Sequence, residues 1–482
     1  MRPVGAEVSA GVRASIVAQS PTNNGGAKGR RNVEFDATRP MEEKPERVSE
    51  TTKPDGEADP TDQRWGWVEP AVWTDRMLDA LHRGVQGGKW HSLIDKVAGK
   101  ENLRSSWEKV SDNEGAPGVD QVTLQEYAQH LDSNIERLSR QILEGDYQPE
   151  PVRRCWIDKP GGGERPLGIP TVKDRVVQTA IRHTIEPIFE REFAERSYGF
   201  RPGRGCKDAL REVDELLEEG YTWVVDADIK SYFDTIPHEK LMDRVREKVS
   251  DGTLLSLIES YLDNEIMEES SEWTPQEGTP QGGPLSPLLA NIYLDPLDQL
   301  MEQEGYRMVR YADDFVVLCE SQQQARQAKQ LIEGWVEEAG LRLHPEKTKL
   351  ADAVDEGFDF LGYRFEGGKR FPKKGSMKGF RDNVRVRTRK NDGRSMKMII
   401  SDLNRYLEGW FNYFKHSYHT WLEALDGFVR RRLRGILRRR AGISGHPNGT
   451  DHHRWPNDFF EEKGLFSLRE ALLGYIQSLR GG

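Results

Sequence analysis

The sequence predicts an α+β protein, because short pairs of apolar strands lie between long helical patterns and a cationic helical region follows them. The clearest strand pair surrounds Tyr311-Ala312-Asp313-Asp314, a tight break with apolar runs on both sides. The clearest helical patterns cover 174–193 and 322–339, where apolar residues recur at three- and four-residue spacing.

Two neighbouring carboxylates, Asp313 and Asp314, are expected at the tip of this hairpin. Adjacent acids at a turn are ordinarily solvated, but the apolar flanks indicate that the hairpin packs inside the protein. Buried carboxylates need a partner, most simply a cation. Because Mg²⁺ prefers carboxylate oxygens together with substrate phosphates, the pattern predicts a third acid elsewhere and a phosphate-bearing substrate.

Length and composition restrict the class of protein. The 482 residues allow about three domains of ordinary size. Cys155, Cys206 and Cys319 form no CxxC pair and no zinc spacing, which favours a reducing compartment. No apolar run is long enough to span a bilayer, and the N-terminal residues lack a signal-peptide pattern, so we expect a cytoplasmic protein without a membrane partner.

Charge is unevenly distributed along the chain. The net charge is −10, yet residues 361–482 carry 26 Lys and Arg against 12 Asp and Glu, a net of +14. Residues 1–360 therefore carry a net of −24. A strongly basic C-terminal quarter attached to an acidic body suggests a polyanion as the partner of the basic part.

Residues 1–62 are expected to be disordered, because they are rich in Gly, Pro, Ser, Thr and charge and have no periodicity. Order is expected from Trp65-Gly66-Trp67 onward. Helical spacing follows at 74–94 and 102–110, and a polar helix ends near Leu143.

A strand, a glycine turn and a second strand are predicted at 156–170, with Lys159 and Arg165 beside the turn. The two cations fit either a plain surface hairpin or a triphosphate clamp, since Arg grips phosphate through its fork and Lys as a point charge. The glycine-rich loop at 197–205 lacks the Walker lysine and serine and is not a P-loop.

The third acid falls in 223–229, which has the pattern of a strand. Alternation places Asp226 and Asp228 on one face of that strand, and spacing alone does not choose between them. A helix start is predicted at Ser286, with a capping hydroxyl followed by Pro287 at the first helical position. The glycines before it allow either close approach of a ligand or only a sharp helix entrance.

The chain beyond the acidic hairpin is predicted as a strand and turn at 340–349 and a second hairpin at 357–365. A heavily cationic loop is expected at 369–397. Helical spacing returns at 403–414 and again from Leu422.

An arginine-rich helix is predicted around residues 430–440, where seven arginines occur without an acid. A solvated charged face is the ordinary alternative, but this many cations exceeds what solubility requires, so the pattern predicts contact with nucleic acid. The arginines assigned to positions off the apolar stripe are Arg430, Arg431, Arg434 and Arg438.

The order of these elements resembles the reverse transcriptases encoded by bacterial group II introns, also called intron maturases, from about Trp65 to the C-terminus. A tyrosine-x-aspartate-aspartate turn alone is weakly specific, whereas all the segments in this order are very specific. The matching segments are Lys-Pro…Arg-Pro-Leu-Gly-Ile-Pro (159–170), Ser-Tyr-Gly-Phe-Arg-Pro (197–202), Ala-Asp-Ile-Lys-Ser-Tyr-Phe-Asp (227–234), Gly-Thr-Pro-Gln-Gly-Gly-Pro-Leu-Ser-Pro-Leu-Leu-Ala-Asn (278–291), Tyr-Ala-Asp-Asp (311–314), Lys-Thr-Lys (347–349), Phe-Leu-Gly-Tyr (360–363) and Gly-Trp-Phe-Asn-Tyr-Phe (409–414).

The resemblance implies a right-hand polymerase with fingers, a palm built on an antiparallel sheet, and a thumb, followed by a mostly helical basic maturase region. The expected boundaries are 1–62 for a disordered tail, 63–366 for fingers and palm, 367–445 for the thumb and RNA-binding maturase region, and 446–482 for a C-terminal extension.

The resemblance also implies a catalytic centre. It selects Asp228 over Asp226 as the metal ligand, so that Asp228 and Asp313 hold two Mg²⁺ ions about 3.5–4 Å apart. Asp314 completes the acidic site, and the carbonyl of Ile229 is a further metal ligand. One ion activates the primer 3′-hydroxyl, and both stabilise charge on the α-phosphate.

Nucleotide-binding residues follow from the same resemblance. Lys159 and Arg165 match the triphosphate clamp, and Phe233 matches the position that blocks a ribose 2′-hydroxyl. Lys347 is the candidate that protonates leaving pyrophosphate. The residues expected to line the nucleotide pocket are Gln281 and Gly282.

The implied function is an RNA-directed DNA polymerase of a bacterial group II intron that also assists intron splicing and mobility. Its expected partners are the intron RNA, an RNA template, a DNA primer, dNTPs and a DNA target site. The basic region contacts phosphates with a strong salt dependence, and its aromatic residues stack on unpaired bases.

Two alternatives remain open from the sequence. A domesticated reverse transcriptase in DNA repair or phage defence has the same motifs. A non-catalytic RNA-binding splicing factor keeps the fold, although the intact acids argue against it. His452 and His453 have no neighbouring cysteines, so we expect surface histidines and no endonuclease domain.

Overall fold

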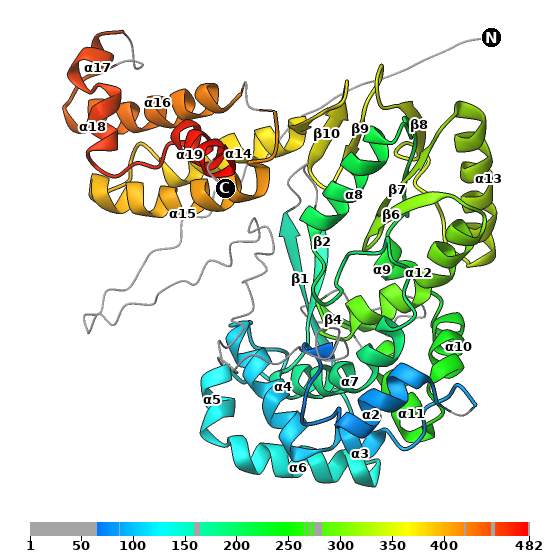
Figure 1. Ribbon diagram of the computed structural model, residues 1–482. Coiled ribbons are helices and arrows are strands. Elements are labelled where there is room, and N and C mark those ends of the chain that lie inside the picture. The colour runs from blue at the N-terminus through cyan, green and yellow to red at the C-terminus, as the bar shows by residue number, and fades with distance from the viewer. Residues whose placement is uncertain are drawn as a thin grey trace, which may run out of the picture. The chain divides into compact units, whose positions relative to one another are not determined.

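The computed structural model describes residues 65–85, 87–158, 164–264, 266–268, 271–273, 282–418, 421–444 and 449–480 (Figure 1). The tail predicted for 1–62 lies outside these residues. The first elements are the helices α2 (Asp75–Arg83), α3 (Ile94–Val97), α4 (Lys100–Asp112), α5 (Leu124–Gln129) and α6 (Leu131–Glu144). The single helix predicted for 74–94 was wrong, because Gly84, Gly87 and Gly88 have φ values of 85°, 78° and 71° and end α2 early.

The predicted hairpin at 156–170 is confirmed as β1 (Val152–Asp158) paired antiparallel with β2 (Glu164–Ile169). The short strands β4 (Ile266–Glu268) and β5 (Ser271–Trp273) extend it into a sheet with the order β2-β1-β4-β5. This sheet leads directly into α7 (Val172–Glu190), the helix predicted for 174–193.

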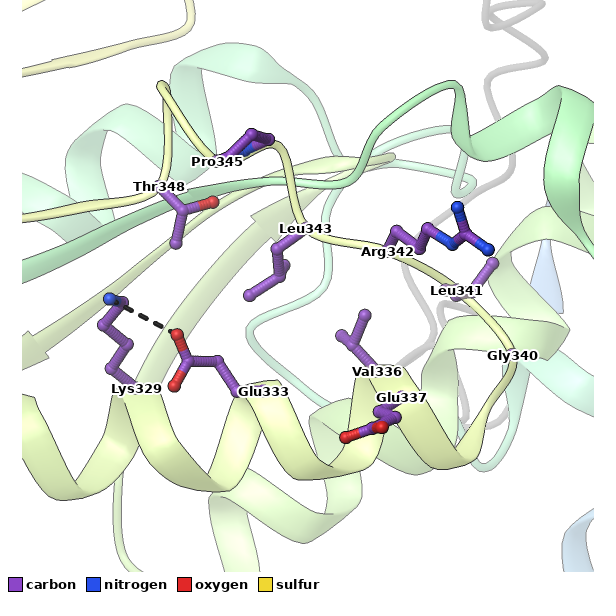
Figure 2. A pocket seen from close by; sticks show the side chains of 10 residues that line it. All are labelled: Lys329, Glu333, Val336, Glu337, Gly340, Leu341, Arg342, Leu343, Pro345 and Thr348. Atoms are coloured by element: carbon purple, nitrogen blue, oxygen red, sulfur yellow. Dashed lines mark ion pairs between the residues drawn. The ribbon is translucent and has the colours of Figure 1, made fainter.

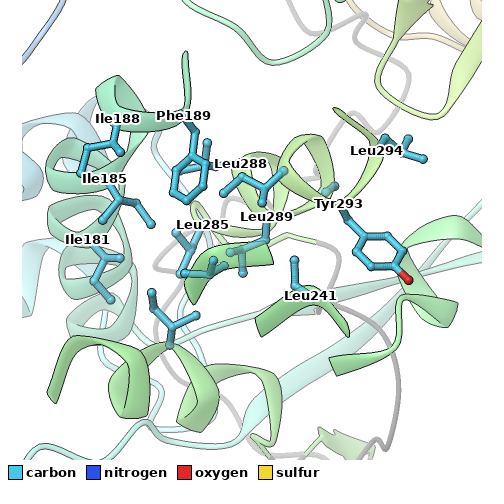
Figure 3. Packing of buried hydrophobic residues seen from close by; sticks show 14 of the residues in the cluster. Ile181, Ile185, Ile188, Phe189, Leu241, Leu285, Leu288, Leu289, Tyr293 and Leu294 are labelled. Atoms are coloured by element: carbon cyan, nitrogen blue, oxygen red, sulfur yellow. The ribbon is translucent and has the colours of Figure 1, made fainter. Parts of the chain in front are cut away.

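The helix α7 lies at the centre of the first hydrophobic core and is buried along almost its whole length. It packs mainly against α4 and also against α3 and α12 (Ser286–Gln303). Figure 3 shows Ile181 and Ile185 of α7 lying beside Leu285 and Leu288 at the start of α12. The predicted start of α12 is confirmed, but Leu285 is the capping residue and Ser286 is already helical, so the predicted hydroxyl cap was wrong.

The central sheet has the strand order β6-β7-β3-β8, and every neighbouring pair in it is antiparallel. It consists of β3 (Trp223–Asp228), β6 (Arg307–Tyr311), β7 (Asp314–Cys319) and β8 (Lys349–Asp352). Ala312 and Asp313 join β6 to β7, which confirms the predicted acidic hairpin. Helices α12 and α13 (Gln322–Glu338) pack on one face, and α8 (Cys206–Glu218) and β9 (Phe358–Phe360) pack on the other.

Three shorter helices complete this part of the chain, namely α9 (Tyr232–Thr235), α10 (His238–Lys248) and α11 (Gly252–Leu262). The hairpin predicted for 357–365 is confirmed as β9 and β10 (Tyr363–Glu366), and β11 (Lys369–Pro372) adds a third strand.

The cationic segment 369–397 is not a loop, as the sequence had suggested. Residues Lys374–Arg387 form helix α14, because Phe380 and Val384 are fully buried at helical spacing while the cations face outward. The many charged residues of this segment made its apolar helical spacing difficult to recognise in the sequence.

The C-terminal elements form a helical bundle that is visible in Figure 1. Both helices predicted from apolar spacing are confirmed as α15 (Met396–Phe414) and α16 (Leu422–Arg440). The chain continues with α17 (Gly449–Arg454), α18 (Asn457–Glu461) and α19 (Leu468–Arg480). Helix α19 packs against α15 and α16 within the second hydrophobic core.

None of the helices in the described ranges combines the length and apolar character needed to cross a bilayer.

Candidate active site

Strand register brings the predicted acids to one end of the central sheet. Asp228, the last residue of β3, is the register partner of Asp314, the first residue of β7. Asp313 precedes Asp314 in the turn, and Asp226 lies two residues further down β3 opposite Val316. The hairpin and the separate strand therefore gather these carboxylates from positions about ninety residues apart in the chain.

The acids of the strands lie on one face of the sheet. On β3, Val225 and Ala227 belong to the first hydrophobic core, whereas Val224 belongs to the second. Since side chains alternate along a strand, Asp226 and Asp228 face the same way as Val224, toward the side covered by α8 and β9. Asp226 and Asp228 lie at the polar end of the strand, and both are only partly exposed.

Mutual repulsion makes this cluster electrostatically costly without a cation. Burial and the charges of Asp226 and Asp313 raise the pKa of Asp314 to about 7, against a smaller lowering by Lys373 and the Leu361 amide. Burial likewise raises the pKa of Asp226 to about 6, although the ammonium of Lys349 lies 3.6 Å from its carboxylate. A divalent ion would relieve this repulsion.

Lys347 already supplies one positive charge to the site. Its Nζ donates to Oδ2 of Asp228 at 2.9 Å. The backbone on either side is paired as well, because the His344 amide donates to the Asp228 carbonyl and Ile229 forms an antiparallel bridge with Leu343. The two backbone hydrogen bonds that flank this bridge do not involve the carbonyl of Ile229, which is the predicted further metal ligand.

The donor set fits a hard divalent cation. Across the described ranges, no three Asp, Glu, His or Cys side chains converge closely enough to hold an ion by themselves. Mg²⁺ is usually held by one or two carboxylates together with substrate phosphates rather than by an all-protein cage. The oxygen donors at the end of β3 and β7 match that manner of binding.

The sequence analysis missed Arg310, which lies directly behind the acidic turn. Arg310 is fully buried and forms an ion pair with Asp298 of α12. Its Nη1 also donates to the carbonyl of Ala312 in the turn at 2.9 Å. A charged residue directly after the apolar pair Met308-Val309 was the signal available in the sequence.

The segment 196–199 forms the other wall of the turn. Its backbone pairs with the outer edge of β6, where the Tyr198 amide donates to the Arg310 carbonyl at 2.8 Å. A Cβ at Gly199 would lie 2.8 Å from the carbonyl carbon of Tyr311 and closer still to the nitrogen of Ala312. Glycine is therefore required there for close approach of the two backbones.

The predicted nucleotide-binding residues are described only in part. Lys159 and Gln281 lie outside the described residues, and for Arg165 only its backbone position in β2 opposite Ile157 is described. Gly282 has φ 124° and packs against the backbone of Gly168 in β2, which brings together the two segments predicted to bind the nucleotide.

Phe233 is half-buried, five residues after Asp228, and its ring packs edge-on against Tyr232 at 5.5 Å. Tyr232 is itself fixed by a 2.6 Å hydrogen bond from its hydroxyl to the Ala290 carbonyl. The short helix that carries Phe233 is thereby anchored to α12.

Two of the four arginines expected to bind RNA point into the protein. Arg434 is 2% exposed, and its guanidinium donates to the carbonyl of Trp455 and to Asn457. Arg438 is 6% exposed and forms an ion pair of 2.8 Å with Asp451. Arg430 is half-buried and Arg431 is exposed, so these two remain the candidates for contact with RNA.

A second cationic surface runs along α14, in the segment expected to be a loop. Its cations are spaced so that they share one helical face. They are Lys374, Lys378, Arg381 and Arg385, of which only Arg381 is half-buried and the others are exposed.

A surface pocket lies between α13 and the segment 340–348 (Figure 2). The ion pair between Lys329 and Glu333, at 3.3 Å, crosses one end of it. Leu343, which forms the β-bridge with Ile229, is one of the residues that line the pocket. The predicted metal-site carboxylates do not line it.

Comparison with known families agrees with the motifs. A family model described as reverse transcriptase (RNA-dependent DNA polymerase) matches residues 157–365. A second model, described as the group II intron maturase-specific domain, matches residues 377–448.

The chain is also similar to individual proteins. Protein YkfC of Escherichia coli (strain K12) is 35% identical over 287 residues, which cover 52% of this chain and 75% of that protein. Group II intron-encoded protein LtrA of Lactococcus lactis subsp. cremoris is 40% identical over 173 residues, 36% of this chain but only 29% of LtrA. A solved partial Cas6-RT-Cas1–Cas2 complex has 27% identity over 51% of this chain and 41% of that chain, with a TM-score of 0.34.

The resemblance identified from the motifs is thus confirmed. This chain belongs to the group II intron reverse transcriptases and maturases, a family of RNA-directed DNA polymerases that act on nucleic acids and depend on divalent metal ions.

Proposed function

We propose that this chain extends a DNA primer on an RNA template by two-Mg²⁺ nucleotidyl transfer, with Asp228, Asp313 and Asp314 as its catalytic carboxylates. The observation that carries the proposal is the register of the central sheet, which sets Asp228 opposite Asp314 beside the turn that contains Asp313. The raised pKa of Asp314 supports it, because burial and the neighbouring carboxylates Asp226 and Asp313 make the ionised form of Asp314 costly, and a bound divalent cation would relieve that cost.

In the proposed reaction the primer 3′-oxygen attacks the α-phosphorus of the dNTP, and the bond to the leaving pyrophosphate breaks. Bound Mg²⁺ would lower the pKa of the 3′-hydroxyl and neutralise the charge that develops on the α-phosphate. Asp228, Asp313 and Asp314 would hold the divalent ions through their carboxylate oxygens and so keep the 3′-oxygen and the α-phosphate in place. Lys347 is positioned within 2.9 Å of Asp228 and is the proposed donor of a proton to pyrophosphate.

Selection of the nucleotide is assigned to residues around this centre. Lys159 and Arg165 clamp the triphosphate, and the ring of Phe233 excludes a ribose 2′-hydroxyl by shape. Gln281 and Gly282 line the pocket. The packing of Gly282 on Gly168 supports this assignment, because it holds the second segment against the strand that carries Arg165.

We assign binding of intron RNA to Arg430 and Arg431 together with the cationic face of α14. Phosphate contacts from these side chains supply affinity without sequence preference. Splicing assistance is then stabilisation of RNA shape, and the same complex uses the RNA as a template and a DNA target site as the source of the primer. The proposed location is the bacterial cytoplasm.

Primer extension tests the proposal. Wild-type protein receives an RNA template, an annealed DNA primer, dNTPs and Mg²⁺, beside Asp313→Ala and the control Asp355→Ala, an exposed aspartate in a turn away from the site. We expect extension by the wild type and the control and none by Asp313→Ala. Failure of the wild type to extend at every salt concentration would leave RNA binding as the function and would reject the catalytic proposal.

A further inference from the structure

The most deeply buried charge of the central sheet is directly connected to the catalytic turn. Arg310 has no exposed side-chain surface, and Asp298 is 4% exposed. The Arg310 Nε donates to both Asp298 oxygens at 2.8 and 2.9 Å, and its Nη2 donates to Oδ2 at 2.5 Å. Buried ion pairs contribute little to net stability, so the burial of this one calls for another explanation.

The remaining hydrogen bonds of Arg310 lead to the turn. Its Nη1 donates to the carbonyl of Ala312 and to Oδ1 of Asn291, both at 2.9 Å. Asn291 in turn donates through Nδ2 to the Gly199 carbonyl at 2.8 Å. Gly199 is the residue whose backbone lies against Ala312. The guanidinium of Arg310 thus holds the turn directly and, through Asn291, also holds the segment 196–199 that lies against it.

The conformation of the turn explains why such support is needed. Ala312 has φ 59°, in the left-handed region that a residue with a Cβ rarely adopts. Residues held there cost about 1–3 kcal/mol each and persist only where their surroundings over-determine them. The bond from Arg310 to the Ala312 carbonyl and the contact with Gly199 together provide that constraint.

We propose that Arg310 is a positioning residue, which fixes the Ala312-Asp313 turn so that Asp313 is directed toward Asp228 and binds the divalent ion. The proposal rests on the proposed function of these carboxylates. Asp298 neutralises the guanidinium, so no net positive charge competes with the ion from beneath the site. Lysine cannot replace arginine, since one ammonium cannot span the carboxylate, the amide and the carbonyl in this fork geometry.

The test compares Arg310→Lys with Arg438→Lys. Arg438 is also buried and bonds both carboxylate oxygens of Asp451 and the carbonyl of Ser444, none of which belongs to the turn or to the segment 196–199. Both variants lose a buried arginine fork, but only one loses the support of Ala312. The measurement is Mn²⁺ binding to the full chain in the presence of RNA template and DNA primer. Binding is monitored through the electron paramagnetic resonance signal of free Mn²⁺, so that no turnover is needed.

We expect Arg310→Lys to weaken Mn²⁺ binding about tenfold and to lower the single-turnover rate constant, normalised to active sites, by roughly 10²-fold, as a displacement of about 1 Å does. The dissociation constant of template–primer stays within twofold. Arg438→Lys keeps Mn²⁺ affinity and rate constant while its melting temperature falls.

A purely structural role would give a different result. Arg310→Lys would then melt earlier but bind Mn²⁺ and extend primer normally once folded, and the inference would be overturned. If Arg310→Lys does not fold, Asn291→Ala decides, because it leaves the ion pair intact and is expected to weaken Mn²⁺ binding in the same direction. If even the wild type fails to extend primer, the proposed function fails, while Mn²⁺ binding still decides the role of Arg310.

Discussion

Lys347 and Asp228 are joined by a 2.9 Å hydrogen bond across 119 residues of sequence. The bond connects the loop after Leu343 to the end of β3, so that the ammonium group of Lys347 lies beside Asp228. The Lys347 side chain keeps 59% of its surface exposed, which leaves it free to reach a leaving group as well as Asp228.

Lys347→Met is predicted to slow nucleotide addition by roughly 10²-fold or more, the scale of a lost general acid. Because the pair with Asp228 is largely exposed, stability changes by less than about 1 kcal/mol. Rapid-quench measurement of single-turnover rates checks this, with Lys349→Met as the control, since Lys349 pairs with Asp226 instead. A rate within threefold of wild type would exclude Lys347 as the proton donor.

Gly199→Ala is predicted to abolish primer extension. The new Cβ would meet the backbone of Tyr311 and Ala312, and backbone cannot yield as a flexible side chain does. Gly334→Ala in α13 is the matched control, because a Cβ there meets open space and should stabilise the helix by about 0.5–1 kcal/mol. Extension assays and thermal melts of both variants decide, and a fully active Gly199→Ala protein would contradict the packing described for the turn.

Asp314→Asn is predicted to stabilise the metal-free protein above neutral pH. The pKa of Asp314 is raised from 3.8 to about 7, so the folded state holds this proton more tightly than the unfolded chain does. The stability from that proton is complete below pH about 4 and is lost as pH rises through about 7. Urea unfolding in EDTA at pH 5 and pH 8 should show a gain of the variant over wild type that is larger at pH 8 than at pH 5 by at least about 1 kcal/mol. An equal difference at both pH values would show that Asp314 is not perturbed.

Arg430 and Arg431 are predicted to differ from Arg434 in what their loss affects. The double variant Arg430→Ala/Arg431→Ala should bind intron RNA more weakly. The magnitude of the slope of log K against log salt concentration should fall by about one to two, because fewer counterions are released on binding when phosphate contacts are lost. Its melting temperature should not change. Arg434→Ala should instead lower stability by about 1–3 kcal/mol, since it leaves the Trp455 carbonyl without its donor. Filter binding across a salt series, beside thermal melts, separates the two effects. The assignment fails if the double variant keeps the wild-type salt slope.

Local patterns in the sequence were sufficient wherever one element carried the signal. The apolar runs around 311–314 predicted the hairpin and its acids, and the pattern at 357–365 predicted β9 and β10. Each depends on side-chain alternation and turn chemistry within a dozen residues.

Features that depend on distant contacts were not predictable in this way. Arg434 and Arg438 look like surface cations on a helical wheel, and only the chain at 451–457 buries them. Arg310 gave no periodic signal, because its acceptors lie on α12 and in the turn. Spacing within β3 does not choose between Asp226 and Asp228, and the prediction of Asp228 came from the family resemblance. The position of Asp228 opposite Asp314 depends on the strand register, which the spacing does not contain.

The strand order β6-β7-β3-β8 has a consequence for synthesis on the ribosome. Strand β3 is complete at residue 228, but its two neighbours end at residues 319 and 352. At roughly 5–20 residues per second, the nascent chain therefore carries an unpaired central strand with two acids for several seconds. No partial product that stops before Asp314 contains all three proposed metal-binding carboxylates, so the proposed site can form only in the later part of translation.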